Sequence, residues 1–341
     1  MAAEAGLQVH YLPLAAARAS ARWEGVLGIA LFGLTRARPI DGLATDIPLA
    51  SVSTPVLVEA GGESCEIWRT DEQLVSGRHS NVHYRRGADV LFGCISLPES
   101  DGLHVATATA YREIFAAVDA LGFPHLLRVW NYLPQINLHT QGIERYWQFN
   151  SARRDTLIAT ARDVTGNVPA ACALGSADGS PLVIYFLASR TAPAVIENPR
   201  QISAYDYPPQ YGPKPVFSRA SLRRADSGTT LFISGTASIV GHRTMHVGDA
   251  AAQTRETLVN IEALLEEANR VSDRLHARAR FDMASLAYKV YVRNPVDLPL
   301  IQFQLQAALG PGAPILYLQA DICRPDLLVE IEATGKDCTC D

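Results

Sequence analysis

The chain has 341 residues and a formal net charge of −5, with 48% hydrophobic and 19% charged residues. This composition is typical of a globular protein with an ample core. Because the charge is mildly negative and no basic block occurs, nothing in it favours nucleic-acid binding.

The sequence also argues against export and membrane insertion. The first residues, MAAEAGLQVHYLPL, lack a cationic segment followed by a long apolar run, so we expect no secretory signal. No stretch approaches the ~18 consecutive apolar residues of a membrane helix. The six cysteines are scattered and form no C-x-x-C pair, which is typical of free thiols in a reducing compartment, and we expect a cytoplasmic protein.

Residues 1–75 are the least regular part of the chain. They contain one short apolar stretch, VLGIALFGL, which predicts a strand, and a region broken by glycine and proline. We interpret them as an N-terminal extension that forms a partial structural unit.

Two later stretches, 76–192 and 229–341, share one order of elements. The first predicts strand 89–97, helix 107–122, strand 126–134, helix 145–161 and strands 169–176 and 181–189. The second predicts strand 229–238, helix 249–268, strand 286–295, helix 299–309 and strands 315–323 and 326–334. Both therefore have the order β–α–β–α–β–β, which indicates an internal duplication and an α/β (α+β) fold. Residues 193–228 join them and are rich in proline and aromatic residues, so we expect an ordered linker that packs over another part of the protein.

The stretch 315–335 predicts a β-hairpin that turns at Arg324-Pro325. In that register one face is apolar, and the other face collects Tyr317, Gln319, Asp321, Cys323, Asp326, Leu328, Glu330 and Glu332. Strands are depleted in Glu, so this mixed face suits a cleft, although a face that simply meets water is the alternative. Aligning the closing strands of the two repeats puts Tyr185 opposite Glu330, so the first copy lacks the acid.

These segments resemble known proteins. FISGTAS, KVYVR and VEIEA resemble the RidA-type β–α–β–α–β–β unit, which usually forms trimers. Over nearly its whole length the chain resembles the chorismatase family, through RVWNYLPQIN, ERYWQFNSARR, SAYDYPPQYGPKPVFSRA and YLQADICRPDLLVEIEATG. The resemblance implies two fused RidA-like domains, at 76–192 and 229–341, in a pseudo-trimer-like arrangement, with the catalytic Glu in the second.

The resemblance to chorismatases implies cleavage of chorismate, with release of pyruvate, by a protein that needs neither a metal nor an organic cofactor. We expect 3-hydroxybenzoate as the second product. Alternatives within the family are hydrolysis to 3,4-dihydroxycyclohexa-1,5-diene carboxylate and mixed 3- and 4-hydroxybenzoate formation. A more remote alternative is a RidA-like enamine deaminase or metabolite-binding protein, against which the fused length argues. We expect a monomer or weak homo-oligomer whose partner is its small-molecule substrate.

Breaking an enol ether requires a positioned general acid, and Glu330 is the candidate. In a half-apolar cleft beside Glu332 its pKa would be raised, and we interpret Glu332 itself as structural or pKa-tuning. The resemblance implies that substrate is bound by Arg153, Arg219 and Arg293, each of which could instead be structural or solvated. Tyr146 and Tyr211 could pack on the substrate ring or hydrogen-bond a carboxylate, and the alternative for both is a core aromatic. The resemblance also implies that Cys323 and Ala237 influence the product. A Cys at 323 is similar to the 3-hydroxybenzoate-forming type, whereas that type carries Gly where this chain has Ala237.

Overall fold

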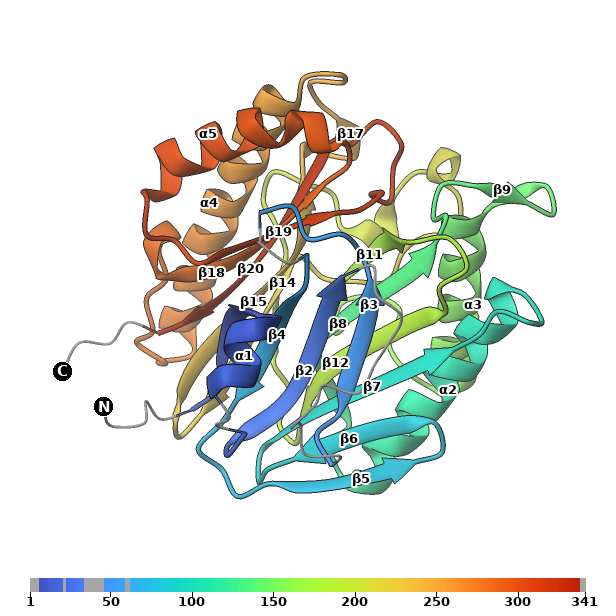
Figure 1. Cartoon of the computed structure of the whole chain (residues 1–341), viewed down its shortest axis with the longest axis vertical. Helices are drawn as coiled ribbons and strands as arrows, with labels where there is room; N and C mark the ends of the chain where they lie inside the picture. The colour runs from blue at the N-terminus through green and yellow to red at the C-terminus, as the bar shows by residue number, and fades with distance from the viewer. Residues whose placement is uncertain (1–5, 21–22, 34–45, 59–61, 338–341) are drawn as a thin grey trace.

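The computed structural model describes residues 6–20, 23–33, 46–58 and 62–337. Three β-sheets lie around a common centre, and helices cover their outer sides (Figure 1). The predicted mixed α/β class is confirmed. Among the helices that the structure describes, none combines the length and the apolar composition that crossing a bilayer requires.

The second sheet along the chain has the strand order β11-β8-β12-β7-β6-β5. Its strands are β5 (Val75–His79), β6 (Val82–Arg86), β7 (Val90–Leu97), β8 (His125–Pro134), β11 (Ala170–Ser176) and β12 (Leu182–Ser189). Its outer face is covered by α2 (Leu103–Leu121) and α3 (Arg145–Ala159), which bury a shared apolar core. Gly122 ends α2 in a left-handed conformation, φ 75°, which a residue with a Cβ adopts less readily.

The third sheet has the equivalent order β19-β18-β20-β15-β14-β13. Its strands are β13 (Ala194–Ile196), β14 (Ala220–Ala225), β15 (Gly228–Ala237), β18 (Leu286–Val292), β19 (Ile315–Gln319) and β20 (Val329–Lys336). Its helices are α4 (Ala250–Arg274) and α5 (Leu298–Leu309), and the Asp249 side chain caps the start of α4 by accepting from the Ala252 amide at 2.9 Å. Strands β13 and β14 lie at the start and at the end of the segment 193–228, so both ends of this segment add a strand to the sheet.

The N-terminal sheet repeats the same order with fewer strands. Its four strands run β3-β2-β4-β1 and are β1 (Gln8–Pro13), β2 (Val26–Gly33), β3 (Leu49–Ser53) and β4 (Ser64–Arg69), with α1 (Leu14–Ser20) against its outer side. Two small two-stranded sheets complete the described strands: β9 (His139–Thr140) with β10 (Ile143–Glu144), and β16 (Ile239–Val240) with β17 (Arg243–Thr244).

The predicted hairpin at 315–335 is wrong. Strand β19 pairs in parallel with β18, and β20 pairs antiparallel with the other edge of β18, so β18 lies between the two expected partners. The cause is the crossover through α5. The chain leaves β18, passes through α5 and returns beside β18 in the same direction, which makes a parallel β–α–β unit. Alternation along β20 is unaffected, so Glu330 and Glu332 still share a face.

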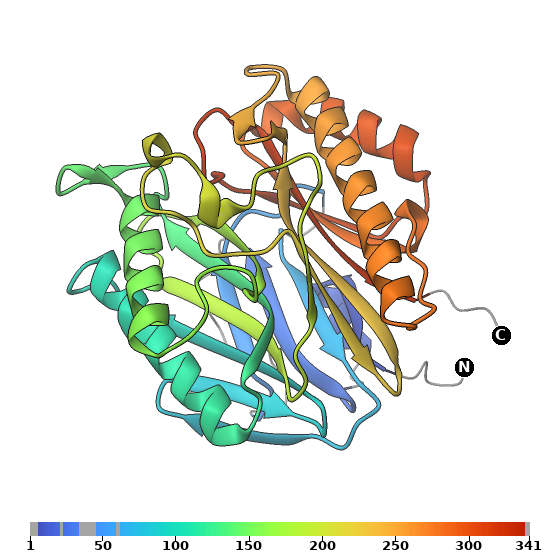
Figure 2. The same ribbon diagram turned by 180° about the vertical axis from the view of Figure 1, so that it is seen from behind.

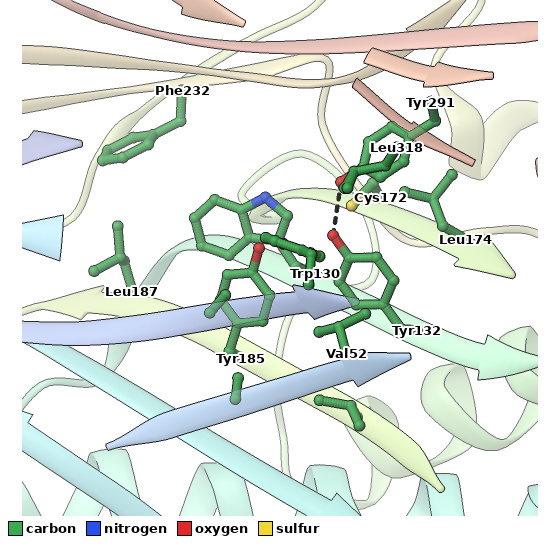
Figure 3. Close-up of a cluster of buried hydrophobic side chains, with 14 of the residues drawn as sticks. Val52, Trp130, Tyr132, Cys172, Leu174, Tyr185, Leu187, Phe232, Tyr291 and Leu318 are labelled. Carbon is green, nitrogen blue, oxygen red and sulfur yellow. Dashed lines mark hydrogen bonds between the residues drawn. The ribbon is translucent and has the colours of Figure 1, made fainter. Parts of the chain in front are cut away.

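The inner faces of the three sheets meet in a central core (Figures 1 and 2). Figure 3 shows part of this core, in which the Tyr132 and Tyr291 hydroxyls hydrogen-bond at 2.7 Å and Trp130 and Tyr185 stack with centroids 4.6 Å apart. Polar atoms from different sheets therefore meet inside an aromatic cluster, and the face of β20 that carries the two carboxylates is directed inward.

Candidate active site

A cavity of about 400 Å³ lies between the second and third sheets. Its walls come from β15 and β20, from the first turn of α3, and from the connection that holds η1 (Ala204–Asp206) and η2 (Pro209–Tyr211). A narrower recess of about 40 Å³ shares the Glu330, Cys323 and Gly235 wall and extends toward Arg153. Of the predicted site residues, those that line the cavity or the recess are Tyr146, Arg153, Tyr211, Arg219, Ala237, Cys323 and Glu330.

Glu330 occupies the boundary between the cavity and the recess. It stands on β20 opposite Ala237 of β15 and is 3% exposed. A bulge in β15 places Gly235 against the carboxyl, where an added Cβ would lie 1.9 Å from Oε1 of Glu330. Only glycine leaves room for the acid at this point. Sequence reasoning missed this requirement, although the second position of SGTAS is the signal for it.

The environment of Glu330 favours its protonated form. Burial raises the pKa of Glu330 to about 8, and the negative charge of Glu332 is the second cause. The positive charges of Arg128, Arg219 and Arg293 act in the opposite direction. A carboxyl that is largely protonated at neutral pH can donate a proton to a bound molecule.

Three guanidinium groups at the cavity hold buried N–H groups that have no acceptor among the described residues. These atoms are Nε and Nη2 of Arg153, Nε of Arg219 and Nη2 of Arg324. Leaving a buried donor unpaired costs about 1–3 kcal/mol. Because guanidinium forks match carboxylates, the arrangement is suited to an anionic ligand with more than one acidic group.

Each of these arginines is held by the surrounding protein. Arg153 donates to the backbone oxygen of Val216 through Nη1. Arg219 donates through Nη2 to the Tyr207 hydroxyl at 2.8 Å. The guanidinium of Arg324 lies 4.2 Å from the ring centre of Tyr211 and 5.0 Å from that of Tyr207. The connection between the repeats therefore forms one wall of the cavity and orients its cations.

Arg293, the third arginine expected to bind substrate, lies outside both the cavity and the recess. Its guanidinium is bonded to the loop that follows β19, behind the cavity wall. Arg324, which sequence reasoning missed, faces the cavity instead. Its position next to Cys323 in the loop sequence CRPD was the available signal, because binding and catalytic residues occur disproportionately on loops.

The Cys323 thiol and the Tyr146 hydroxyl both have raised pKa values. Burial raises the pKa of the Cys323 thiol to about 12, with the Glu330 charge as the second cause. Burial also raises the pKa of the Tyr146 hydroxyl well above its ordinary value. Both side chains therefore keep their protons, and a thiolate form of Cys323 is not favoured.

Glu332 lies two residues beyond Glu330 but belongs to a different environment. It accepts hydrogen bonds from Lys289 Nζ at 2.7 Å, from Trp130 Nε1 at 2.7 Å and from Arg128 Nη2. Burial by itself would raise the pKa of Glu332, but Lys289 and Arg128 lower it below its ordinary value. Glu332 is therefore an ionised member of a buried ion-pair cluster.

The expected correspondence of Tyr185 with Glu330 is wrong by two residues. Phe92 of β7 and Phe232 of β15 occupy equivalent positions in the two repeats, and they pair with Leu187 and Thr334. Counting back along each closing strand from these partners puts Tyr185 in the place of Glu332 and Val183 in the place of Glu330. Lys289 Nζ lies 2.9 Å from the Tyr185 hydroxyl, in the cluster that contains Glu332. The closing strands β12 and β20 are offset by two residues relative to their equivalent partners β7 and β15. An ungapped alignment of the two strand sequences does not reveal this offset, so the sequence alone misplaced the pair.

Comparisons with known proteins place these residues in context. A family model described as Chorismatase FkbO/Hyg5-like, N-terminal, matches residues 66–188. The chain is 39% identical over 274 residues to a chorismatase of Streptomyces rapamycinicus, covering 78% of this chain and 80% of that protein. It is 37% identical over 274 residues to a 3-hydroxybenzoate synthase of Streptomyces hygroscopicus, with the same coverages of 78% and 80%.

The chain is also similar to solved structures. A chorismatase crystal structure superposes with a TM-score of 0.86 at 32% identity, covering 98% of this chain and 100% of the other. A protein of the Rid family, YyfA from Yersinia pestis, aligns with 42% of this chain and 99% of its own length at 18% identity and a TM-score of 0.33.

Proposed function

This chain belongs to the chorismatase family of chorismate-cleaving enzymes, and we propose from that premise that it converts chorismate into pyruvate and 3-hydroxybenzoate. Glu330 is the general acid of the proposed reaction. The observation that carries this assignment is the buried Glu330 carboxyl in the cavity wall, whose pKa of about 8 keeps it protonated near neutral pH. The more remote enamine deaminase or metabolite-binding alternative is not retained, because the family membership covers most of the chain.

The first step is protonation of the methylene carbon of the enolpyruvyl ether by Glu330. Protonation there leaves an oxocarbenium ion, whose ether bond to ring carbon 3 then breaks as pyruvate forms with the ether oxygen. The hydroxyl oxygen on carbon 4 then shifts to carbon 3 and one ring proton is lost, which gives 3-hydroxybenzoate without uptake of water. Positioned proton donors of this kind contribute about 10²–10⁴ in rate. The ionised carboxylate of Glu330 then remains beside a cationic intermediate, which it stabilises electrostatically.

The arginines would hold the two carboxylates of chorismate on opposite sides of Glu330. Arg153 serves the recess, with two buried N–H groups directed to no protein acceptor among the described residues. Arg219 and Arg324 serve the larger cavity. Two separated anion sites would fix both the ring and the enolpyruvyl group, which is the geometric requirement for proton transfer to one carbon.

The neutral Cys323 thiol supports the aromatising outcome. Chorismate divides into pyruvate and 3-hydroxybenzoate without net addition of water, whereas the diene-diol takes up one water molecule. A partly buried thiol beside the acid can occupy space that water would need, and it can relay a proton during aromatisation. Ala237, which faces the same cavity, is the observation that favours hydrolysis to 3,4-dihydroxycyclohexa-1,5-diene carboxylate as the second candidate.

The test is to incubate the purified protein with chorismate and to identify all products by chromatography. We expect pyruvate and 3-hydroxybenzoate in equal amounts. A diene-diol as the main product would replace the proposed reaction with hydrolysis, and a substantial share of 4-hydroxybenzoate would establish the mixed outcome. Glu330→Gln is the control that links any product to this cavity.

A further inference from the structure

The loop between β19 and β20, residues 320–328, brings Cys323 and Arg324 to the cavity. It contains no regular element, and separate segments hold its backbone. The Gly175 backbone amide donates to the Asp321 backbone oxygen at 2.7 Å, and the Asn137 side-chain amide donates to the Ile322 backbone oxygen at 3.0 Å. The position of both functional side chains therefore depends on contacts made to the loop from other parts of the chain.

Arg293 makes the largest set of these contacts. Its Nε donates to the Leu327 oxygen at 2.7 Å, and its Nη2 donates to the Ile322 oxygen at 3.0 Å and the Arg324 oxygen at 2.9 Å. Its Nη1 completes the set. This atom donates to the Asp321 carboxylate at 2.6 Å and to Asn137 Oδ1 at 3.1 Å.

A guanidinium group has five N–H donors, and the five bonds of Arg293 account for all of them. Four of the five acceptors belong to the 320–328 loop, and the fifth, Asn137, bonds the same loop. Arg153, Arg219 and Arg324 differ, since each keeps at least one buried N–H without an acceptor among the described residues. Arg293 is thus equipped to hold a loop, and it has no donor left for a substrate.

We propose that Arg293, together with Asn137, is a positioning residue that fixes Cys323 and Arg324 relative to Glu330 and thereby sets the product ratio without touching the substrate. This inference rests on the proposed function for its product readout. A second readout, the accessibility of the Cys323 thiol, is independent of the reaction.

The Arg293→Lys variant separates position from charge. Lysine keeps the positive charge near Glu330, so the electrostatics of the acid are largely retained. A single ammonium group cannot reach acceptors distributed from Asp321 to Leu327, so most of the loop contacts are lost. Asn137→Ala removes the bond to Ile322 and one acceptor of Arg293, and it provides a second, milder variant.

The experiment compares wild type with Arg293→Lys, Asn137→Ala, Cys323→Ala and the double variant Arg293→Lys/Cys323→Ala. The product ratio is measured at equal chorismate conversion. We expect Arg293→Lys to shift the ratio in the same direction as Cys323→Ala, and any rise in KM to come through the displaced Arg324. Because the ratio depends on the position of Cys323, the double variant should have the ratio of Cys323→Ala alone.

The second measurement is the rate at which iodoacetamide alkylates Cys323, followed by mass spectrometry of its peptide. We expect Arg293→Lys and Asn137→Ala to accelerate alkylation several-fold. Arg190→Lys is the matched control, because Arg190 also donates to backbone oxygens, those of Ala88 and Gly122, but it lies outside the cavity. Its alkylation rate should equal that of wild type.

A KM raised tenfold or more in Arg293→Lys, with product ratio and alkylation rate unchanged, would mean that Arg293 binds substrate and would overturn the proposal. A ratio shift that adds to that of Cys323→Ala would also overturn it. If Arg293→Lys does not fold, Asn137→Ala carries both measurements. A wild type that forms only the diene-diol would refute the proposed product while the alkylation rates still decide the role of Arg293.

Discussion

Glu330 and Glu332 lie two residues apart on one face of β20, and both are nearly inaccessible, at 3% and 4% exposure. Burial raises the pKa of Glu330 to about 8, whereas Lys289 and Arg128 overcome burial at Glu332 and lower its pKa. Equal burial therefore gives opposite acidities, because the partners differ. Glu330 faces the cavity against Gly235, and Glu332 faces two cations at the centre of the molecule.

The central cluster around Glu332 joins all three sheets. Lys289 of β18 bonds Glu332 of β20, Glu66 of β4 and the Tyr185 hydroxyl of β12, and Arg128 of β8 pairs with Glu332. Burying such charges costs free energy, and removing one partner leaves the charges of the others buried without compensation. The contrast on β20 is thus between a carboxyl available for chemistry and a carboxylate whose charge is used within the structure.

The largest expected effect is on turnover in Glu330→Gln. The substitution keeps size and removes the titratable proton, so kcat should fall by about 10²–10⁴ with the fold intact. Circular dichroism and the unfolding midpoint check the fold, and steady-state kinetics measure kcat. Retained turnover in Glu330→Gln combined with an inactive but folded Glu332→Gln would reverse the roles of the two carboxylates.

The second prediction concerns stability in Glu332→Gln. Removing this charge leaves Arg128 without its carboxylate and Lys289 with Glu66 alone. Breaking a buried ion pair costs about 3–5 kcal/mol, to be measured by urea unfolding. The Glu332→Gln variant, where folded, should still turn over chorismate. A stability equal to that of wild type would show that the cluster does not depend on this charge.

Gly235→Ala should lower kcat through Glu330 and leave the ion pairs of Glu332 intact. The added methyl group overlaps the carboxyl of Glu330, so the acid must move, and displacements of about 1 Å can cost about 10² in rate. Gly312→Ala is the matched control, since a Cβ there meets nothing within 4 Å. Equal kcat values for the two variants would contradict the packing of Gly235 against the acid.

The smallest effects are those of a change of one pH unit on each carboxyl. The folded pKa of Glu330 is raised, so it contributes stability below its unfolded value near 4.5, and this is lost as pH rises through about 8. The pKa of Glu332 is lowered, so its contribution is present above 4.5 and is lost as pH falls. Each group changes the free energy of unfolding by at most about 1.4 kcal/mol per pH unit.

Urea unfolding from about pH 2 to 9 measures both slopes. Glu330→Gln should remove the decline that runs from the unfolded value near 4.5 up to about pH 8, and Glu332→Gln should remove the decline below 4.5. The same reasoning predicts that wild-type kcat falls as pH rises past about 8, because the general acid loses its proton. A kcat that rises through this range would identify a base where we assign an acid.

Much of the fold could be predicted from the sequence because periodicity is local. The repeated order of strands and helices follows from apolar spacing within each segment, and alternation along 329–336 correctly put Glu330 and Glu332 on one face. Pairing is not local. The predicted 315–335 hairpin failed because a strand from earlier in the chain, β18, lies between its two halves.

The candidate site shows the same division. Residue type and resemblance drew attention to Glu330, Cys323, Arg153 and Arg219, all of which line the cavity or its recess. Arg293 was expected beside them for the same reasons, but its donors are consumed by a loop whose course the sequence does not specify. Whether an arginine meets a ligand or a backbone oxygen depends on what lies within about 3 Å of it.

The chemical groups of the protein, and the helices and strands that carry them, follow from the amino-acid sequence, since side-chain chemistry and helix or strand periodicity are properties of short segments. Tertiary structure decided their acidities and partners. It set Glu330 against a glycine in a bulged strand and Glu332 between Lys289 and Arg128, which come from two different sheets. A pKa depends on charges and solvent within a few ångströms, and here those neighbours are brought together only by folding.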